Sequence, residues 1–352
     1  EGSGLSVLID ILAYNTHYNA YLGNMLLNEM FLDSAVKRSS AISIAKHLGY
    51  TPSSIRSARA NVNVTVLDPT DNPDTLVIEP RTTFNTTING NSFTFVNLES
   101  ASITPVGNNY SLSGLEIVEG TNRALSFVVA DPSPDEKFTI PDNNIDISTL
   151  KVTVQGSTSN TFTNSYSRVI DISNVSTSSR VFFLEMNPQE KYEIFFGDGV
   201  IGDKLIQGNL VNIDYLLSSG TIVNTSNNAS VSFTAGSAIG GSSDITVTTA
   251  SNPTSAKDAD SITDIKFKAP RVNSARNRAV TAGDYKTLIE ANFTDAESVI
   301  VYGGEDNVPP KFGKVMISLK PFDGFNISQT TKDAIVTQIL KDRKVMSVQP
   351  EF

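Results

Sequence analysis

Three glycines with the spacing of a dinucleotide-binding loop are the residues whose types and order first suggest chemistry in this chain. Gly197, Gly199 and Gly202 follow an apolar run at 192–196 that has the composition of a strand. In a nucleotide site, such glycines let the backbone approach a pyrophosphate, and a helix that follows directs its N-terminal amides at the negative charge. A helix after the glycines is therefore the test of this interpretation.

The residues after the glycines lack a helical pattern. Gly208 and Asn209 form a turn signal inside 203–213, and the apolar run 210–217 follows at once. This connection is too short and too broken to cross over to a parallel strand. We therefore expect two strands, 192–196 and 210–217, joined as a hairpin by a glycine-rich turn.

Asp198 and Asp203 in the same segment offer a calcium loop as another alternative. Such loops need oxygen ligands at dense, alternating positions, which this segment lacks. We expect Gly197, Asp198, Gly199 and Gly202 to set the shape of the backbone, and we expect no metal and no cofactor to bind.

Side chains suited to catalysis are scarce. The chain has no cysteine and two histidines, His17 and His47, both in segments that we expect to be helical. His17 suits a hydrogen-bonded interface, and His47 precedes a helix-ending glycine, where the helix dipole favours positive charge. No metalloprotease, nucleophile-elbow or P-loop motif occurs. Paired carboxylates for glycoside chemistry stay open, because Asp and Glu are scattered, but we expect no catalytic residues and no enzyme.

Composition limits the class of protein further. The 352 residues suffice for two or three domains, and a formal net charge of -10 argues against a general nucleic-acid binder. Charged residues make up 18% of the chain, which suits a surface covered by other proteins more than by water. No apolar run approaches the ~20 residues of a membrane span. Because the chain begins with Glu1, we expect the gene product to begin earlier.

One local segment is basic. It consists of Lys266, Lys268, Arg271, Arg276 and Arg278. Nucleic acid is one possible partner of such a segment, but in an acidic protein a salt-bridged contact to an acidic neighbouring subunit is the favoured interpretation.

A long helix is expected at 5–32, with a bend near Gly23. Its apolar residues follow a heptad seam, and Asp10 and Glu29 are its only formal charges. Leu8, Leu12, Leu22 and Leu26 lie outside the seam, so the helix has apolar residues on more than one side. The residues that we expect to contact a partner are Ile11, Tyr14, Tyr18, Tyr21, Met25 and Leu32.

Two arrangements could bury this helix. It could pack inside its own domain, or it could join a bundle with other chains. One more helix follows, at 34–48, before Gly49 and Pro52 end it. Since two helices cannot bury three apolar faces, we favour the bundle with other chains.

The remaining chain predicts two β-rich domains and a small α+β domain. Val62, Val64 and Val66 alternate with polar residues, as in a half-buried strand. A proline-containing break at 131–134 divides the β-rich part. The expected fold is thus multidomain α+β: a helical partner-binding segment at 1–58, β-rich domains at 59–131 and 132–255, and an α+β domain at 256–352.

The last domain carries a helix-start signal. Thr281 with Asp284 resembles a capping box and predicts a helix to about residue 292. A second amphipathic helix is expected at 328–345, with Ile335, Ile339 and Leu340 inward. The pattern stops in a strand at Phe352, so we expect this domain to be truncated.

Two segments together resemble the baseplate J-like family. They are FGDGVIGDKLIQGNLVNIDYLLSSGTIVN at 196–224 and APRVNSARNRAVTAGDYKTLI at 269–289. The opening segment 5–52, LSVLIDILAYNTHYNAYLGNMLLNEMFLDSAVKRSSAISIAKHLGYTP, is similar to baseplate wedge proteins of contractile-tailed bacteriophages. The three segments occur in the family's order. Such wedge proteins are longer, so the resemblance implies that a C-terminal dimerisation region is absent.

The resemblance implies a structural protein of the virion's tail baseplate, made in the host cytoplasm. It implies that several copies join other wedge proteins around the hub, and that the N-terminal helices pair with a second copy and with a helix of another wedge subunit. A sheath-initiating, lysozyme-like wedge protein would dock nearby, and the assembly would rearrange when the sheath contracts. The glycine turn would define the fold, and Arg271, Arg278, Thr281 and Asp284 would belong to the second family segment.

Two other classes of function compete with this one. A carbohydrate-binding or glycan-cleaving tail component would need exposed aromatic platforms, which without tryptophan would fall to Tyr110 and Tyr166. A portal-type protein in contact with nucleic acid is disfavoured by the negative charge.

Overall fold

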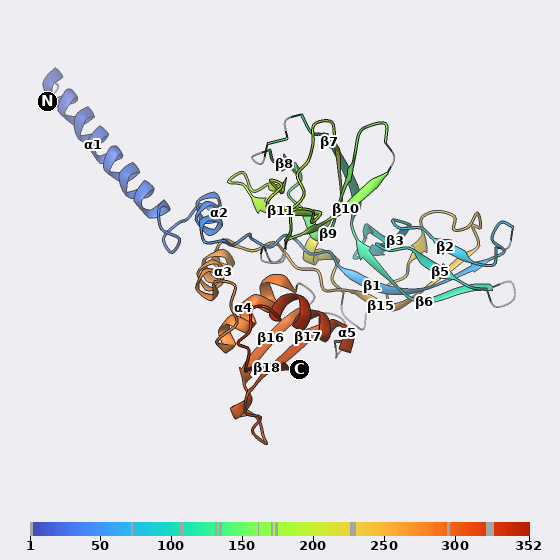
Figure 1. Cartoon of the computed structure of the whole chain (residues 1–352). Coiled ribbons are helices and arrows are strands. Elements are labelled where there is room, and N and C mark those ends of the chain that lie inside the picture. The colour runs from blue at the N-terminus through green and yellow to red at the C-terminus, as the bar shows by residue number, and fades with distance from the viewer. Residues whose placement is uncertain are drawn as a thin grey trace.

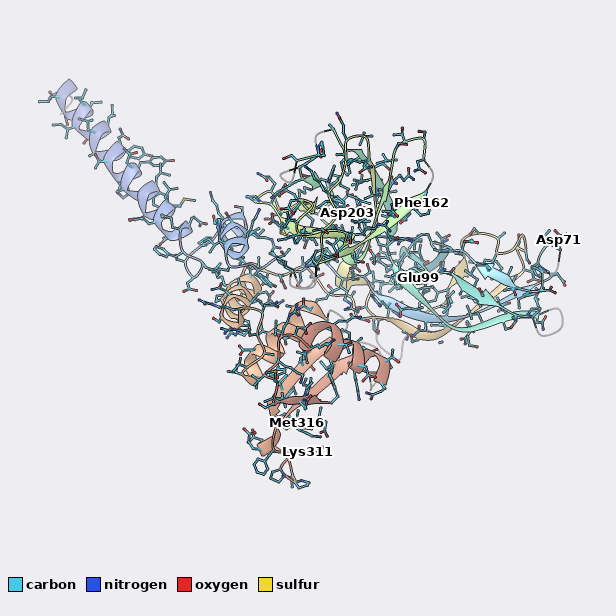
Figure 2. All side chains as sticks on the ribbon, viewed as in Figure 1. Asp71, Glu99, Phe162, Asp203, Lys311 and Met316 are labelled. Atoms are coloured by element: carbon cyan, nitrogen blue, oxygen red, sulfur yellow. The ribbon has the colours of Figure 1, made fainter. Side chains whose placement is uncertain are left out.

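The computed structural model describes residues 3–71, 73–105, 109–130, 132–133, 136–160, 162–169, 172, 175–225, 230–293, 296–321 and 327–352. A long N-terminal helix stands away from a body made of two β-rich domains and a C-terminal part in which helices cover a small sheet (Figure 1). In Figure 2, Asp71 marks the far end of the first β-rich domain, Phe162 and Asp203 lie on the second, and Lys311 and Met316 lie in the C-terminal part. The expected class, multidomain α+β, is confirmed.

The first helix, α1, spans Gly4–Glu29 and the second, α2, spans Arg38–His47. α1 continues through Gly23 without interruption and ends three residues before the expected position. It ends there because the Ser34 hydroxyl donates a hydrogen bond to the Asn28 carbonyl at 2.7 Å, closing a turn. This turn also delays the start of α2 from the expected residue 34.

The first β-rich domain is built on a six-stranded sheet with the order β14-β3-β4-β6-β1-β15, in which all pairs are antiparallel. A two-stranded sheet of β2 and β5 accompanies it. The strands are β1 (Arg59–Leu67), β2 (Leu76–Ile78), β3 (Thr83–Ile88), β4 (Asn91–Val96), β5 (Ala101–Ile103), β6 (Asn109–Glu119), β14 (Thr234–Ala235) and β15 (Ile245–Thr254). The alternation expected around Val62, Val64 and Val66 is confirmed, since all three are fully buried.

The second β-rich domain is a seven-stranded sheet with the order β7-β13-β9-β10-β11-β12-β8. Its strands are β7 (Thr121–Val128), β8 (Phe138–Thr139), β9 (Ile145–Gln155), β10 (Thr163–Arg168), β11 (Val181–Met186), β12 (Tyr192–Phe196) and β13 (Leu210–Leu217). The rings of Phe127 in β7 and Phe138 in β8 lie 5.4 Å apart. The two edge strands therefore approach each other, and the sheet is rolled around its core.

The expected hairpin between 192–196 and 210–217 is wrong, although both strands exist. β12 pairs with β11 and β8, whereas β13 pairs with β7 and β9. β13 alternates buried and half-buried residues, so it fits between two partners inside the sheet. The glycine turn therefore crosses the end of the rolled sheet and does not join neighbouring strands.

The sheets also divide the chain differently from the expected boundaries at residues 131 and 255. β7 precedes residue 131 but belongs to the second sheet, and β14 and β15 return to the first sheet after it. The chain passes between the sheets at Gly120, whose φ is 144° and whose missing Cβ would lie 2.8 Å from the Leu217 carbonyl oxygen. Of the expected break at 131–134, Asp131 and Pro134 lie outside the described residues.

The C-terminal part contains helix α4 (Ala282–Asn292) and strands β16 (Ala296–Gly303), β17 (Lys314–Pro321) and β18 (Gln349–Glu351). Helix α5 (Gln329–Ala334) continues as a π-helical turn at Ile335–Leu340, where the expected inward residues Ile335, Ile339 and Leu340 are buried. The helix ends at 340, short of the expected 345. Short 3-10 turns occur at Gly220–Val223 and Gly304–Asp306.

Helix α3 (Ile262–Ala275) was not expected from the sequence. Pro270 lies inside it, and the basic residues of this segment obscure the apolar spacing of Ile265, Ala269 and Val272. Ile265 and Ala269 belong to the same core as Ala41 of α2. α2 and α3 thus pack together on the second β-rich domain.

Candidate assembly interface

Helix α1 buries none of its residues against the rest of the chain. Five of the six expected partner residues, Ile11, Tyr14, Tyr18, Tyr21 and Met25, are exposed on it, and Tyr14 exposes 71% of its surface. The sixth, Leu32, lies beyond the helix end and is half-buried against the main core. The structure thus brings five of these residues together on one free helix, and their role as an interface stays a prediction.

The apolar surface of α1 is unusually wide for a helix in water. At 100° per residue, its large apolar side chains cover about two-thirds of the circumference. The polar strip opposite includes Ser6, Asp10, His17 and Asn24. Burial of a large apolar side chain is favourable by ~1.5–3 kcal/mol, so a helix of this kind is stabilised by neighbours on more than one side.

The root of α1 is fixed to the body by hydrogen bonds. The Glu29 carboxylate accepts hydrogen bonds from the backbone N–H of Val36 at 2.9 Å and of Lys37 at 3.2 Å. A hydrogen bond from the Ser40 side chain, followed by that from Val36, lowers the pKa of the Glu29 carboxyl. Lys266 of α3 donates to the Asp33 carbonyl at 2.8 Å. The free helix therefore begins at a defined point beside α3.

A buried carboxylate, Asp260, joins the helices to the segment that leads into the first sheet. It is 2% exposed and accepts hydrogen bonds from the Tyr50 hydroxyl and the Ser53 N–H, while its other oxygen receives the Lys268 ammonium. The Arg38 guanidinium donates to its backbone carbonyl. Burial, followed by the charge of Asp260, raises the pKa of the Tyr50 hydroxyl. Tyr50 and Lys268 are thereby held in one polar cluster.

Two further buried carboxylates link the β-rich domains. Asp146 of β9 accepts a hydrogen bond from the Ser57 N–H at 2.8 Å. Glu119, at the end of β6, accepts one from the Ser218 hydroxyl at 2.8 Å and one from the Ser219 N–H at 3.1 Å. Sequence reasoning missed Asp146, Asp260 and Glu119, because their partners lie far away along the chain and leave no local pattern.

The glycine turn is shaped by backbone contacts. A Cβ on Gly197 would lie 2.5 Å from the carbonyl carbon of Gly202, so the two backbones touch there. Asp198 accepts hydrogen bonds from the N–H groups of Val200 and Ile201, both at 2.8 Å, and these bonds, that from Ile201 first, lower the pKa of its carboxyl. The Asp198 carboxylate therefore caps its own loop.

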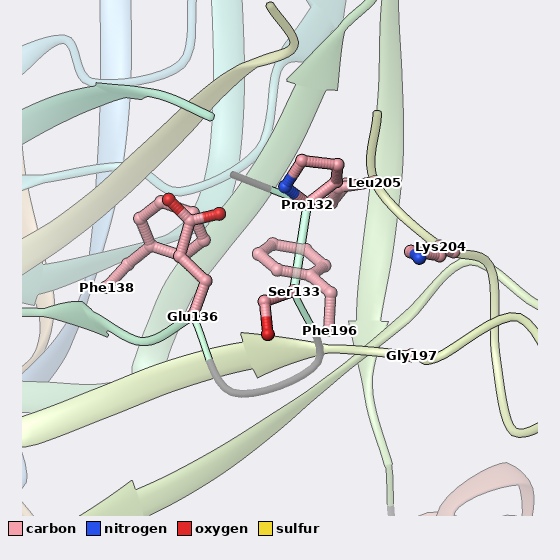
Figure 3. Close-up of a pocket in the computed structure, with 8 residues that line it drawn as sticks. All are labelled: Pro132, Ser133, Glu136, Phe138, Phe196, Gly197, Lys204 and Leu205. Atoms are coloured by element: carbon pink, nitrogen blue, oxygen red, sulfur yellow. The ribbon is translucent and has the colours of Figure 1, made fainter. Parts of the chain in front are cut away.

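The hollow beside this turn is too small for a nucleotide. Gly197, Lys204, Phe196 and Glu136 are among the residues that line it (Figure 3). Its volume of about 10 Å³ leaves room for no more than about one water molecule. Asp203, the other acid of the expected calcium alternative, accepts a hydrogen bond from the Tyr166 hydroxyl at 3.0 Å.

The expected basic segment serves several roles. Lys268 pairs with Asp260, whereas Arg271, Arg276 and Arg278 are exposed.

The expected capping box is present at the start of α4. The Asp284 N–H donates to the Thr281 hydroxyl at 3.2 Å, and the Thr281 N–H donates to the Asp284 carboxylate at 2.8 Å.

Other expected sites can now be placed. Tyr110 and Tyr166, suggested as sugar platforms, are both buried, so that suggestion is wrong. His17 lies on α1 and His47 ends α2, and both are exposed. Within the described ranges, no group of three or more His, Asp or Glu side chains is arranged to hold a metal ion. No described helix combines the length and the apolar character needed to cross a membrane.

Comparison with known families gives three matches along the chain. Residues 1–50 match the helical domain of "baseplate wedge protein gp6-like", residues 129–227 match the third domain of "bacteriophage baseplate wedge protein gp6", and residues 281–352 match C-terminal domain I of "baseplate structural protein gp6". The first match includes all of α1 and α2, and the second begins within the first residues after β7 and includes the glycine turn.

Individual proteins were also matched. The chain is 25% identical, over 382 aligned positions, to the baseplate wedge protein gp6 of Enterobacteria phage T4. That alignment covers 100% of this chain and 54% of the T4 protein, so the chain spans about half the length of this relative. A cryo-EM structure of the anti-feeding prophage baseplate matches with 12% identity and a TM-score of 0.35, covering 99% of this chain and 66% of that chain. This likeness is too low to support a conclusion about the fold.

Proposed function

We propose, from the premise that this chain belongs to the gp6 family of baseplate wedge proteins of contractile-tailed phages, that it is a structural subunit that assembles through helix α1. The match of residues 1–50 to the gp6-like helical domain confirms the resemblance of the opening residues to wedge proteins. The place of the protein is the tail baseplate of the virion. The resemblance to the baseplate J-like family stays a prediction.

The observation that carries this proposal is the exposure of an apolar helix with a fixed root. Large apolar residues such as Tyr18 and Leu26 lie in solvent along α1, while Glu29 holds its root. A helix that is apolar on more than one side accommodates two neighbours. We assign one neighbour to α1 of a second copy and the other to a helix of a different wedge subunit.

Two finer parts of the proposal concern the assembled baseplate. We place the sheath-initiating, lysozyme-like wedge protein among the neighbours of this subunit around the hub. We also propose that the subunit moves when the sheath contracts.

Light scattering after size exclusion tests the assembly role. We expect the whole chain to self-associate, and the double variant Tyr18→Asp, Met25→Asp to be monomeric, because two buried carboxylates would oppose packing of the seam. Neither residue is buried in the chain, so the β-rich domains of the variant should stay folded, with an unchanged strand signal in circular dichroism.

A matched control adds the same charge to the polar strip of α1. The double variant Ser6→Asp, Asn24→Asp should associate as the unchanged chain does, because these positions lie away from the apolar residues. Equal molar masses for the unchanged chain and the seam variant would contradict the proposal.

A further inference from the structure

The helices at the root of α1 form a basic region in an acidic protein. Residues 30–47 and 262–278 contain eight Lys and Arg side chains and two carboxylates, whereas the whole chain has a net charge of -10. The eight are Lys37, Arg38, Lys46, Lys266, Lys268, Arg271, Arg276 and Arg278. Positive charge is thus concentrated at the root of α1, where this helix meets the body.

Internal ion pairs account for three of these eight. Arg38 pairs with Glu190, Lys46 with Glu185, and Lys268 with Asp260. Across the described ranges, no carboxylate lies within ion-pair distance of the remaining five side chains, Lys37, Lys266, Arg271, Arg276 and Arg278. Lys37 lies near the Glu29 carboxylate, whose pKa its charge helps to lower. The other four provide positive charge that the described part of the fold does not pair with a carboxylate.

Arg271 is held in a geometry suited to a protein partner. Its guanidinium lies 3.4 Å from the centre of the Phe267 ring and donates to the Phe267 carbonyl at 2.6 Å. Phe267 is 58% exposed, and the two residues are four apart on the side of α3 opposite the buried Ile265 and Ala269. Arginine beside an exposed aromatic ring is typical of protein interfaces, and an ordered guanidinium loses little freedom when it binds a carboxylate.

This surface adjoins the root of the proposed assembly helix. Lys266 donates to the Asp33 carbonyl, and Met30, Phe31 and Val36 around the root are exposed. α1 itself carries no Lys or Arg, so its apolar seam does not distinguish acidic from basic partners. A helix that lies along α1 and reaches the root meets the cations of α3 there.

We propose that a surface formed by Phe267 and Arg271 on the outward side of α3, with Lys266 on its flank and Arg276 and Arg278 just after the helix, selects a partner helix that carries carboxylates where it reaches the root of α1. This inference rests on the proposed assembly role of α1 and adds the chemistry of the partner. The apolar seam supplies affinity, and the cations determine which helix binds and at which position along α1 it lies.

Two synthetic peptides provide the test. Both have the same apolar heptad seam, but one has glutamates and the other lysines in the turns at both ends. Binding of each fluorescent peptide to the whole chain is measured by anisotropy at low salt. We expect the acidic peptide to bind about tenfold more tightly, with a preference that weakens as salt is added.

Charge reversal on this surface should invert that preference. The double variant Arg271→Glu, Arg278→Glu should bind the lysine peptide more tightly than the glutamate peptide. The matched control Lys332→Glu, Lys341→Glu changes the same charge in the C-terminal part and should keep the preference of the unchanged chain.

Each alternative outcome is distinct. Equal binding of both peptides, or an unchanged preference in the Arg271→Glu, Arg278→Glu variant, would overturn this inference and leave the role of α1 standing. Binding of neither peptide would overturn both. Tighter binding of a short DNA duplex than of the acidic peptide, lost in the same variant, would assign the surface to nucleic acid instead.

Discussion

At the scale of single residues, glycine is required in the turn after β12 because neighbouring atoms leave no room. Gly202 has a φ of 89°, and a Cβ there would lie 2.9 Å from a methyl group of Val181. Gly208 has nearly the same φ, 88°, but nothing lies within 4 Å of its Cβ position. The two positions share the backbone strain and differ in the space available.

We therefore expect Gly202→Ala to destabilise the protein more than Gly208→Ala. Both substitutions place a side chain in the left-handed region, at a cost of ~1–2 kcal/mol. Gly202→Ala adds the displacement of Val181, for a further ~1–3 kcal/mol. Urea unfolding of both variants measures the difference, and equal midpoints would show that the contact with Val181 relaxes freely.

At the scale of elements, α3 has a structural face and an exposed face. Ile265 is fully buried between α3 and the core of the second sheet, whereas Phe267, two residues on, contacts solvent. The same helix can therefore hold the fold together with one side and leave the other side available for a partner.

Replacing one side chain on each face of α3 by alanine should separate the structural role from the proposed binding role. Ile265→Ala should lower the free energy of unfolding by ~2–4 kcal/mol, because it leaves a cavity in the core. Phe267→Ala should change it by less than ~0.5 kcal/mol, because the ring is mostly exposed. Thermal or urea unfolding measures both, and a large loss for Phe267→Ala would show that this ring supports the fold.

At the scale of the whole molecule, Glu119 connects the two β-rich domains, since it lies on β6 and its partners Ser218 and Ser219 follow β13. Burial raises the pKa of its carboxyl, and the hydrogen bonds from Ser219 and Ser218 oppose that rise. A raised pKa means that the folded state holds the proton more tightly than the unfolded chain. Its contribution to stability is therefore full at low pH and is lost as the pH rises through the folded pKa.

Glu119→Gln, which cannot ionise, should remove this dependence. We expect the stability of the variant, relative to the unchanged chain, to be more favourable at neutral pH than at acidic pH, where the native carboxyl gains its proton. Comparing the two proteins at each pH cancels the opposite contributions of Glu29 and Asp198, whose pKa values are lowered. A difference that does not change with pH would contradict the prediction.

The sequence by itself determined the local elements, and it favoured an N-terminal helix that packs against other chains. The heptad seam predicts α1, the alternation of Val62, Val64 and Val66 predicts β1, and Thr281 with Asp284 predicts the start of α4. These patterns are local, because propensity, side-chain period and capping act over a few residues. The scarcity of charge on α1 also indicated a helix that needs neighbours.

Only the tertiary structure decided how these elements combine. The pairing of β12 and β13 with other strands, the return of β15 to β1, and the burial of Asp260 each depend on residues far apart in the chain. The sequence did not predict α3, because Pro270 and the basic residues around it are typical of a loop. The helix is recognised only from the burial of Ile265 and Ala269 in the core. Strand order and buried ion pairs arise from long-range packing, which leaves no periodic trace in the sequence.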